Sequence, residues 1–579
     1  MTVVILVGTE TGNSLDYATR ASENLERLGI ENEIYLMDEY PLEGLLDVSV
    51  VIFVCSTTGD GEEPTNMRQF MKFLLRADLP NNLFAGIGFA VFGLGDSSYD
   101  KFNYVGKRVY RRMQQLGGRD LVGFRGEGDE RSAKGIEGGW SAWWEELADK
   151  MKQEYSDGLG CVYGDLEPLP PRCSLILTPT NRGNRDESGA FSANLDSYER
   201  LTPTDHFQDT RLLKFNVKIP ADSAYKFQPG DILNLKPSND PEIVEELMEL
   251  MGWKGEGKEE VVVYGIEGKF VRNWDQVLPR EFPMSLREFL TQWVDLTRIP
   301  SRSTLKTLAC LCEPDAAEYS PMHRDKLIEL SRDEGEYLDY VWRPKRSIVE
   351  ILKDFQPTVR IDFDKLLQVL VPIKPRQFSI ANDPLGQTDL RIELLVALVK
   401  EELPMGRGTR EGLCSQWISS DRIRRELGHV TISRGSFNNF VLKPVIFLFA
   451  TGTGIAPLRS IIHRYSSSRR IYLYFGCRSI TQDFYFEEEW RDTNNLTVFA
   501  KGSRDEKGKR VYLNDVISSN TDPLRGYGVD EISCLVAGHS RLNKLVQDTL
   551  NEIWTDKVEG KSWIEYLKSR GQYQTETWS

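Results

Sequence analysis

One stretch near the C-terminal end constrains the fold more than any other. The apolar run 445–449 leads into Gly452-Thr453-Gly454, and helical apolar spacing then continues to Tyr465. This order predicts a buried strand, a tight glycine turn and a helix. The glycines allow a ligand close to the backbone, and the helix start offers unpaired N–H groups to a phosphate. Taken alone, the turn equally fits an ordinary strand-to-helix connection of a doubly wound sheet.

The length and composition indicate a multidomain globular protein. With 579 residues, 40% of them hydrophobic and 27% charged, the chain has room for about three or four domains. Its formal net charge of −15 argues against nucleic-acid binding, which requires a basic face. The eight cysteines include no Cys-x-x-Cys pair, so we expect reduced thiols and no metal site. The sequence has no signal peptide and no apolar run of about 18 residues, which predicts a cytoplasmic protein without a membrane anchor.

A second loop of this kind follows the first apolar run of the chain, residues 3–7. This run is typical of a parallel strand covered on both faces, and an amphipathic helix follows it to about Leu28. The loop between them is rich in hydroxyl groups and contains no lysine or arginine, which argues against a nucleoside triphosphate loop. Its hydroxyls and the helix start predict a site for a phosphate dianion. The candidate residues are Thr9, Glu10, Thr11, Gly12, Asn13 and Ser14.

The same pattern recurs twice, after the apolar runs 50–55 and 89–95. Both loops lie at the carboxyl ends of predicted strands, where open α/β sheets bind their ligands. A polar loop followed by an aromatic one suits a flat heteroaromatic ring, with Tyr99 as the stacking candidate. Tyr99 equally fits a surface aromatic residue at a helix start. The candidate residues are Ser56, Thr57, Thr58, Gly59, Leu94, Gly95, Asp96, Ser97, Ser98, Tyr99, Asp100, Lys101, Phe102 and Asn103.

These loops carry a resemblance to a known family. Thr-Glu-Thr-Gly-Asn, Ser-Thr-Thr-Gly-Asp-Gly and Gly-Leu-Gly-Asp-Ser-Ser-Tyr occur in order, and they resemble the three FMN loops of flavodoxins. The resemblance implies a doubly wound flavodoxin-like domain over residues 1–152. It assigns the phosphate of FMN to 9–14 and the isoalloxazine ring to 56–59 and 94–103. Asp129 matches an acidic position of the same family.

The middle of the chain changes character twice. Glycine and proline accumulate over 153–172, which indicates a linker. Strand-like segments at 191–198, 210–219 and 231–235 then suggest an antiparallel barrel. From about 241 to 340 the apolar spacing is helical, which predicts an inserted helical block that serves as scaffold.

Two further segments suit a dinucleotide. Arg376-Gln377-Phe378-Ser379 offers a cation for a pyrophosphate, an aromatic ring for stacking and a hydroxyl for a ring edge, although an ordinary edge strand also fits. A turn-to-helix entry follows, composed of Gly412, Leu413, Cys414 and Ser415. Together the two segments resemble the FAD site of ferredoxin–NADP reductases, which implies an FAD-binding barrel over 173–440. Arg346 follows Lys345 where related diflavin enzymes keep a basic pair that contacts FAD.

The opening turn, Gly452, Thr453 and Gly454, resembles the NADPH loop of the same reductases, which implies a Rossmann-like NADPH domain over 441–579. Asp483 matches an NADP-contacting position. Cationic and hydroxyl groups also gather between residues 503 and 513, where they suit an adenosine 2′-phosphate, although a solvated charged loop is the simpler alternative. The candidate residues are Ser503, Arg504, Lys509, Arg510, Val511, Tyr512 and Leu513.

Four residues are candidates for tuning hydride transfer. Cys477 ends a predicted strand and matches a cysteine beside the nicotinamide, although such a cysteine is often only a small buried apolar residue. Glu576 stands where relatives carry an acidic partner of the hydride-transfer group. Trp578 resembles the penultimate aromatic residue that covers the FAD ring. With Ser379, these residues form the predicted catalytic set.

Over its whole length the chain resembles the diflavin reductases, an α/β multidomain family. The resemblance implies that FMN, FAD and NADPH are the cofactors, and that a hydride passes from NADPH to FAD before electrons leave singly through FMN. It is closest to the soluble members of cytosolic iron–sulfur protein assembly, which implies a monomer whose acceptor is an anamorsin-type iron–sulfur protein. The alternatives are a soluble P450-type or sulfite-reductase-type reductase, and a catalytically silent interaction protein.

Overall fold

The computed structural model describes most of the chain. The described residues are 3–10, 12–59, 61–155, 163–164, 167–170, 173–178, 190–220, 223, 225–254, 262–268, 281–384, 389–503, 510–539 and 541–578. Among the predicted site residues, Thr11, Arg504 and Lys509 lie outside these ranges, as does much of the linker predicted over 153–172.

The chain divides into two units, each assembled from segments that are distant in sequence. One unit comprises Met1–Glu187, Ser238–Lys374 and Glu402–Gly408, and the other comprises Ser188–Pro237, Pro375–Glu401 and Thr409–Ser579. No helix within the described ranges is long and apolar enough to cross a membrane.

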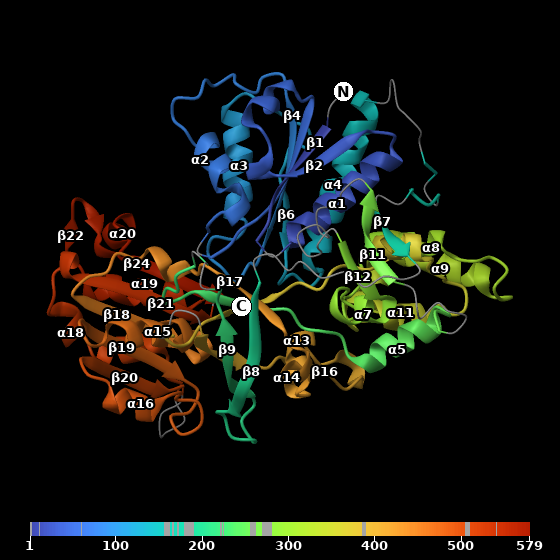
Figure 1. Ribbon diagram of the computed structural model, residues 1–579. Coiled ribbons are helices and arrows are strands. Elements are labelled where there is room, and N and C mark those ends of the chain that lie inside the picture. The colour runs from blue at the N-terminus through green and yellow to red at the C-terminus, as the bar shows by residue number, and fades with distance from the viewer. Residues whose placement is uncertain are drawn as a thin grey trace. The chain divides into compact units, whose positions relative to one another are not determined.

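The first unit begins with a doubly wound parallel sheet of strand order β2-β1-β3-β4-β5, in which β6 also pairs with β4. Successive side chains of a strand point to opposite faces, so all-apolar strands need cover on both. Helices α1 and α4 pack on one face and α2 and α3 on the other (Figure 1). The predicted flavodoxin-like fold is confirmed. Its elements are β1 (Val3–Gly8), α1 (Asn13–Arg27), β2 (Asn32–Leu36), β3 (Val50–Ser56), α2 (Arg68–Leu74), β4 (Gly88–Gly95), α3 (Tyr104–Gln115), β5 (Arg119–Asp120), β6 (Gly126–Asp129) and α4 (Gly135–Tyr155).

The same unit contains the predicted helical block. Its helices bury one continuous apolar core, and they are α5 (Pro241–Leu250), α7 (Leu286–Gln292), α8 (Arg302–Cys310), α9 (Ser320–Arg332), α10 (Glu334–Tyr337), α11 (Ile348–Asp354) and α12 (Leu366–Val369). A three-stranded antiparallel sheet, not predicted from the sequence, belongs to the same unit in the order β12-β11-β7. Its strands are β7 (Cys173–Thr178), β11 (Val262–Gly268) and β12 (Glu281–Ser285).

The second unit contains the predicted antiparallel barrel. Six strands follow the order β13-β10-β17-β8-β9-β14, and a bridge between Ile380 and Leu394 joins the two ends of the sheet. The elements are β8 (Phe191–Arg200), β9 (Thr210–Lys218), β10 (Ile232–Leu235), β13 (Arg376–Ser379), β14 (Asp389–Ala397), β15 (Lys400–Glu402), β16 (Thr409–Glu411), α13 (Leu413–Ser419), α14 (Arg422–Glu426) and β17 (His429–Ser433).

A second parallel sheet completes this unit, in the order β20-β19-β18-β21-β24. Helix α15 packs on one face, and α19 and α20 pack on the other (Figure 1), where α17 joins the same apolar core. The strand, turn and helix predicted over 445–465 are confirmed. The elements are β18 (Val445–Thr451), α15 (Ile455–Tyr465), β19 (Arg470–Cys477), α16 (Glu487–Asp492), β20 (Leu496–Gly502), α17 (Leu513–Ser519), α18 (Asp522–Arg525), β21 (Ile532–His539), α19 (Leu542–Ile553), β22 (Lys557–Val558), β23 (Lys561–Ser562), α20 (Trp563–Ser569) and β24 (Tyr573–Trp578).

Replacing Trp143 by alanine tests the packing beneath the first sheet. Trp143 is fully buried against Phe92 and Trp140, and deleting such a side chain leaves a cavity that costs about 3–5 kcal/mol. We expect the backbone amides of β1 and β4 in Trp143→Ala to lose their protection from hydrogen exchange at a clearly lower urea concentration than in the parent chain. Trp144→Ala, at a partly buried neighbour, should cost less. Equal losses of stability in Trp143→Ala and Trp144→Ala would contradict this packing.

Candidate functional site

The first phosphate loop is tightly curled between β1 and α1. Gly12 has a φ of 84°, in the left-handed region that favours glycine. Its N–H donates to Thr9 Oγ1 at 2.8 Å, and the Thr9 N–H donates to Asn66 Oδ1 at 2.9 Å. Asn66 was not predicted from the sequence, because it belongs to a different loop and meets Thr9 only in the fold.

The buried hydroxyl of Ser14 indicates that this loop can hold a ligand. The side chain is fully buried, and its Oγ has no hydrogen-bond partner among the described residues. A buried hydroxyl without a partner is costly, so the loop fits a group that accepts hydrogen bonds, such as a phosphate. Glu10 instead accepts from the backbone N–H of Thr65 at 2.8 Å, and Asn13 donates to Glu130 at 3.1 Å.

Carboxylates shape the third loop of the first sheet. Asp129 accepts from the backbone N–H groups of Ser97 and Arg131, both at 3.0 Å. Asp96 accepts from the Ser98 N–H at 2.7 Å and from Arg131 Nε at 3.2 Å. Burial opposes ionisation of Asp96, but the hydrogen bonds from Ser98 and Arg131 outweigh it and lower the pKa of the carboxyl.

A second buried atom lacks a partner among the described residues where the two loops predicted to flank a ring meet. Asn103 is buried with a φ of 49°, and its Oδ1 has no hydrogen-bond partner among the residues described. A Cβ at Gly95 would lie 2.8 Å from this atom. Thr57, from the second loop, donates its N–H to the Leu94 carbonyl at 3.0 Å. The second and third loops are therefore in direct contact, as a shared ring site requires, and Tyr99 is half-buried beside them.

The predicted FAD segments lie in the second unit. Arg376 and Phe378 are half-buried and Gln377 is exposed. Gly412 precedes α13, and the Ser415 hydroxyl accepts from the Val399 N–H at 2.8 Å. The remaining members of the second segment, Leu413 and Cys414, are buried, and burial raises the pKa of the Cys414 thiol to about 12.

Arg346 belongs to the first unit, where it has its own partners. Its guanidinium pairs with Asp354 and lies 4.4 Å from the centroid of the Tyr340 ring. The contact between Arg346 and FAD stays a prediction.

The structure joins Ser379 to Glu576. The Ser379 hydroxyl donates to Glu576 Oε1, and Oε2 is shielded from solvent without a hydrogen-bond partner in the described part of the chain. Burial raises the pKa of Glu576 to about 7, although the hydrogen bond from Ser379 acts in the opposite direction. A proton donor and a carboxyl that titrates near neutrality therefore share one position at the edge of the second parallel sheet.

Cys477 lies elsewhere in that sheet. It ends β19, and strands β18 and β21 separate it from β24, which carries Glu576. At about 4.8 Å between neighbouring strands, the two backbones are roughly 14 Å apart. Burial raises the pKa of the Cys477 thiol to about 12, so it is protonated at neutral pH. The residue paired with Glu576 in β21 is Ala537.

The turn after β18 favours glycine at two positions for different reasons, a left-handed backbone at Gly452 and close packing at Gly454. Gly452 has a φ of 54°, and a Cβ at Gly454 would lie 2.1 Å from the Ala537 carbonyl oxygen. In the first turns of α15, Ser460 is fully buried and its hydroxyl has no partner among the described residues. This turn therefore repeats two features of the first loop, a glycine in the left-handed region and a buried hydroxyl without a described partner.

Cationic and aromatic groups gather beyond the ends of β19 and β20. The Ser503 N–H donates to the Arg478 carbonyl at 3.2 Å, and Asp483 accepts from the Arg478 N–H at 2.9 Å. Arg510 is exposed and Tyr512 is 53% exposed, so both are open to a ligand, whereas the neighbouring Val511 and Leu513 are buried. Arg478, which sequence reasoning missed although it follows Gly-Cys at a strand end, stands 3.8 Å from the Phe207 ring centroid.

Comparisons with known proteins agree with this arrangement. The family models described as Flavodoxin, FAD binding domain and Oxidoreductase NAD-binding domain match residues 5–143, 183–417 and 448–548. A protein named NADPH-dependent diflavin oxidoreductase 1 from Debaryomyces hansenii is 33% identical over 613 residues, covering 100% of this chain and 98% of the relative. Proteins of the same name from Xenopus laevis and Bos taurus are 33% and 30% identical, each covering 100% of this chain and 99% of the relative.

The chain belongs to the NADPH-dependent diflavin oxidoreductase family. The predicted oxidoreductase activity and the predicted cofactors FMN, FAD and NADPH are confirmed, and the silent interaction protein is not supported. This one chain combines a flavodoxin domain, an FAD-binding domain and a nicotinamide-binding domain.

Replacing Glu576 by glutamine tests the buried carboxyl of this oxidoreductase. The pKa of Glu576 in the folded chain is about 7, above its ordinary value of 4.5. Between about pH 4.5 and pH 7, the folded chain therefore binds more protons at this carboxyl than the unfolded chain does. Its free energy of unfolding therefore falls as the pH rises through that window. We expect Glu576→Gln to remove this part of the fall, measured as the denaturation midpoint between about pH 5 and pH 8. Glu552→Gln, at an exposed carboxyl, should keep the parent profile; matching profiles for Glu576→Gln and the parent would contradict the assignment.

Proposed function

We propose that this oxidoreductase passes electrons from NADPH through FAD and FMN to an anamorsin-type iron–sulfur protein of cytoplasmic iron–sulfur assembly. The contact between Ser379 and Glu576 carries the proposal, since it brings a candidate FAD strand against the last strand of the nicotinamide sheet. The acceptor rests on the subfamily resemblance of the sequence. The cytoplasmic location is supported by the cysteines whose side chains are described, which are all free thiols. We also propose that the protein is a monomer.

The proposal assigns a role to each group of residues. Gly12 and Ser14 hold the FMN phosphate, and the loops around Thr57 and Asn103 flank its ring. Residues 376–379 and 412–415 hold FAD, and the turn 452–454 holds the NADPH pyrophosphate. The cluster beyond β19 and β20, which consists of Arg478, Ser503, Arg510 and Tyr512, is proposed to recognise the adenosine end of NADPH.

The chemistry divides between cofactors and protein. The flavins, when bound, supply the conversion of a two-electron donation into single-electron delivery. The chain itself positions the reactants and sets the charge around them. Ser379 and Glu576 keep a hydroxyl and a carboxyl at the proposed hydride site, and the raised pKa of Glu576 makes that charge sensitive to pH near neutrality.

Mixing the NADPH-reduced protein with candidate acceptors tests the proposal. An anamorsin-type iron–sulfur protein should reoxidise the flavins faster than a cytochrome P450 or a sulfite reductase haemoprotein at equal concentration, as followed by stopped-flow absorbance. Faster reoxidation by either competitor would favour the corresponding alternative. Failure of NADPH to reduce the flavins at all would contradict the function as a whole.

Removing the Trp578 side chain tests its proposed position over FAD. Trp578 is 37% exposed at the end of β24, beside His539 of β21, so its ring is accessible. In the proposed position over FAD, a nicotinamide has to displace this ring. We expect Trp578→Ala to raise the use of NADH relative to NADPH by about tenfold, equal to about 1.4 kcal/mol, because NADH lacks the 2′-phosphate that helps NADPH to displace the ring. Trp578→Phe should preserve most of the preference. An unchanged ratio of kcat/KM values in Trp578→Ala would contradict the position.

A further inference from the structure

The phosphate loop of the flavodoxin-like domain contains no cation of its own in its described residues, yet a lysine stands at it. Lys374 Nζ donates to Asn13 Oδ1 at 3.2 Å and lies 3.6 Å from Asp16 Oδ2. A Cβ built on Gly12 would lie 3.2 Å from the same Nζ. Lys374 comes from outside the flavodoxin fold, since it follows α12 and precedes the candidate FAD residue Arg376 by two positions.

The loop also contains a hydroxyl group that can donate a hydrogen bond to a phosphate. The Ser14 hydroxyl is fully buried and has no partner among the described residues. It belongs to the first turn of α1, a 15-residue helix whose N-terminus favours an anion. Lys374 Nζ is already hydrogen-bonded to Asn13, the residue next to Ser14. A dianion held by Ser14 and the helix start would therefore have this ammonium group beside it as a countercharge.

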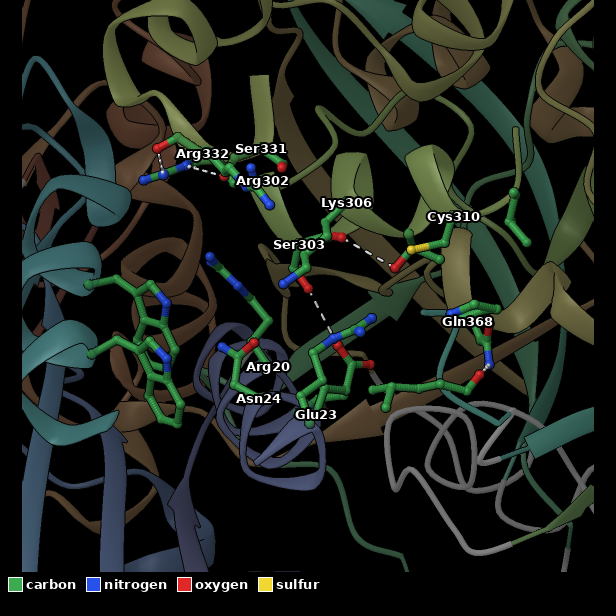
Figure 2. A pocket seen from close by; sticks show the side chains of 18 of the residues that line it. Arg20, Glu23, Asn24, Arg302, Ser303, Lys306, Cys310, Ser331, Arg332 and Gln368 are labelled. Atoms are coloured by element: carbon green, nitrogen blue, oxygen red, sulfur yellow. Dashed lines mark hydrogen bonds between the residues drawn. The ribbon is translucent and has the colours of Figure 1, made fainter. Parts of the chain in front are cut away.

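The junction that brings Lys374 to the loop is polar and hollow. Asp16 pairs with Arg298, Ser141 accepts from Arg302 Nη1 at 2.8 Å, and Ser303 donates to Glu23 at 3.4 Å. Between α1 and α4 on one side and α8 and α9 on the other lies a cavity of about 490 Å³, and Glu23, Arg302 and Ser303 are among the residues that line it (Figure 2). Protein interiors are normally close-packed, so a junction of this kind is weakly held by packing alone.

We propose that Lys374 is a positioning residue for the FMN phosphate, supplied by the helical block to a flavodoxin loop without a cation. Because the lysine reaches the loop only when α1 lies against the helical block, phosphate binding and this junction stabilise each other. The coupling is reciprocal by thermodynamic necessity. The inference rests on the proposed assignment of the phosphate to Gly12 and Ser14.

The test compares Lys374→Gln with the parent chain and with Lys374→Arg. We expect Lys374→Gln to raise the dissociation constant of FMN about tenfold, as loss of one charge-assisted hydrogen bond predicts. The increase should shrink at high salt, which screens the parent's charge interaction. Lys374→Arg should bind FMN nearly as tightly as the parent. The constants are measured by FMN fluorescence in the full-length chain with FAD retained.

A matched control removes a lysine of the same unit whose ion pair lies within its own segment. Lys365 pairs with Asp362, three residues away, so Lys365→Gln makes the same change of charge without altering FMN affinity. In the parent, FMN should also slow hydrogen exchange in α8 across the junction, and Lys374→Gln should lose this protection while keeping that of α1.

Three outcomes separate the possibilities. Weaker FMN binding in Lys374→Gln alone, with FAD content and α1 protection retained, supports the inference. Equal FMN affinities in Lys374→Gln, Lys365→Gln and the parent would overturn it and leave the proposed function intact. A parent chain that binds no FMN would overturn the proposed function itself.

Discussion

The hydrogen bond between Ser379 and Glu576 is the contact on which the proposed electron path depends. It joins β13 of the antiparallel barrel to β24, the last strand of the nicotinamide sheet. Other contacts also join the barrel to this sheet, such as Arg459 with Glu393 and Tyr485 with Thr210, but this hydrogen bond links two residues of the predicted catalytic set. Burial of the Glu576 carboxyl raises its pKa to about 7, and the hydrogen bond from Ser379 limits this rise because it favours the ionised form.

The two parallel sheets share the same physical features at their proposed phosphate turns. Each has a glycine in the left-handed region after a central strand, Gly12 in one and Gly452 in the other. Each also buries a serine hydroxyl without a described partner, Ser14 and Ser460. Helix starts supply N–H groups and a favourable dipole, so neither turn needs a cation within its described residues. In our proposal, the turn at Gly12 receives a cation, Lys374, from a distant segment of the chain, so Lys374 substitutions test how that turn binds phosphate.

Local sequence patterns predicted much of the fold, because apolar runs report burial directly. Strands β1, β3, β4 and β18 are continuous apolar stretches that end in glycine or hydroxyl-rich loops. The sheet formed by β7, β11 and β12 was not predicted, since its strands come from separated segments and Pro283 interrupts one of them. Contacts between distant segments were beyond sequence reasoning, as the placement of Lys374 at Asn13 illustrates. The separation of Cys477 from Glu576 likewise depends on strand order, which no local pattern encodes.

The central claim is that a single chain carries two different flavins in two separate sites. Denaturing the purified holoprotein and separating the released flavins by chromatography tests this claim most directly. We expect one FMN and one FAD for each chain, with FMN alone lost when Ser14 is replaced by a bulky residue. Release of a single kind of flavin from every preparation, with the Ser14 loop never binding FMN, would contradict it.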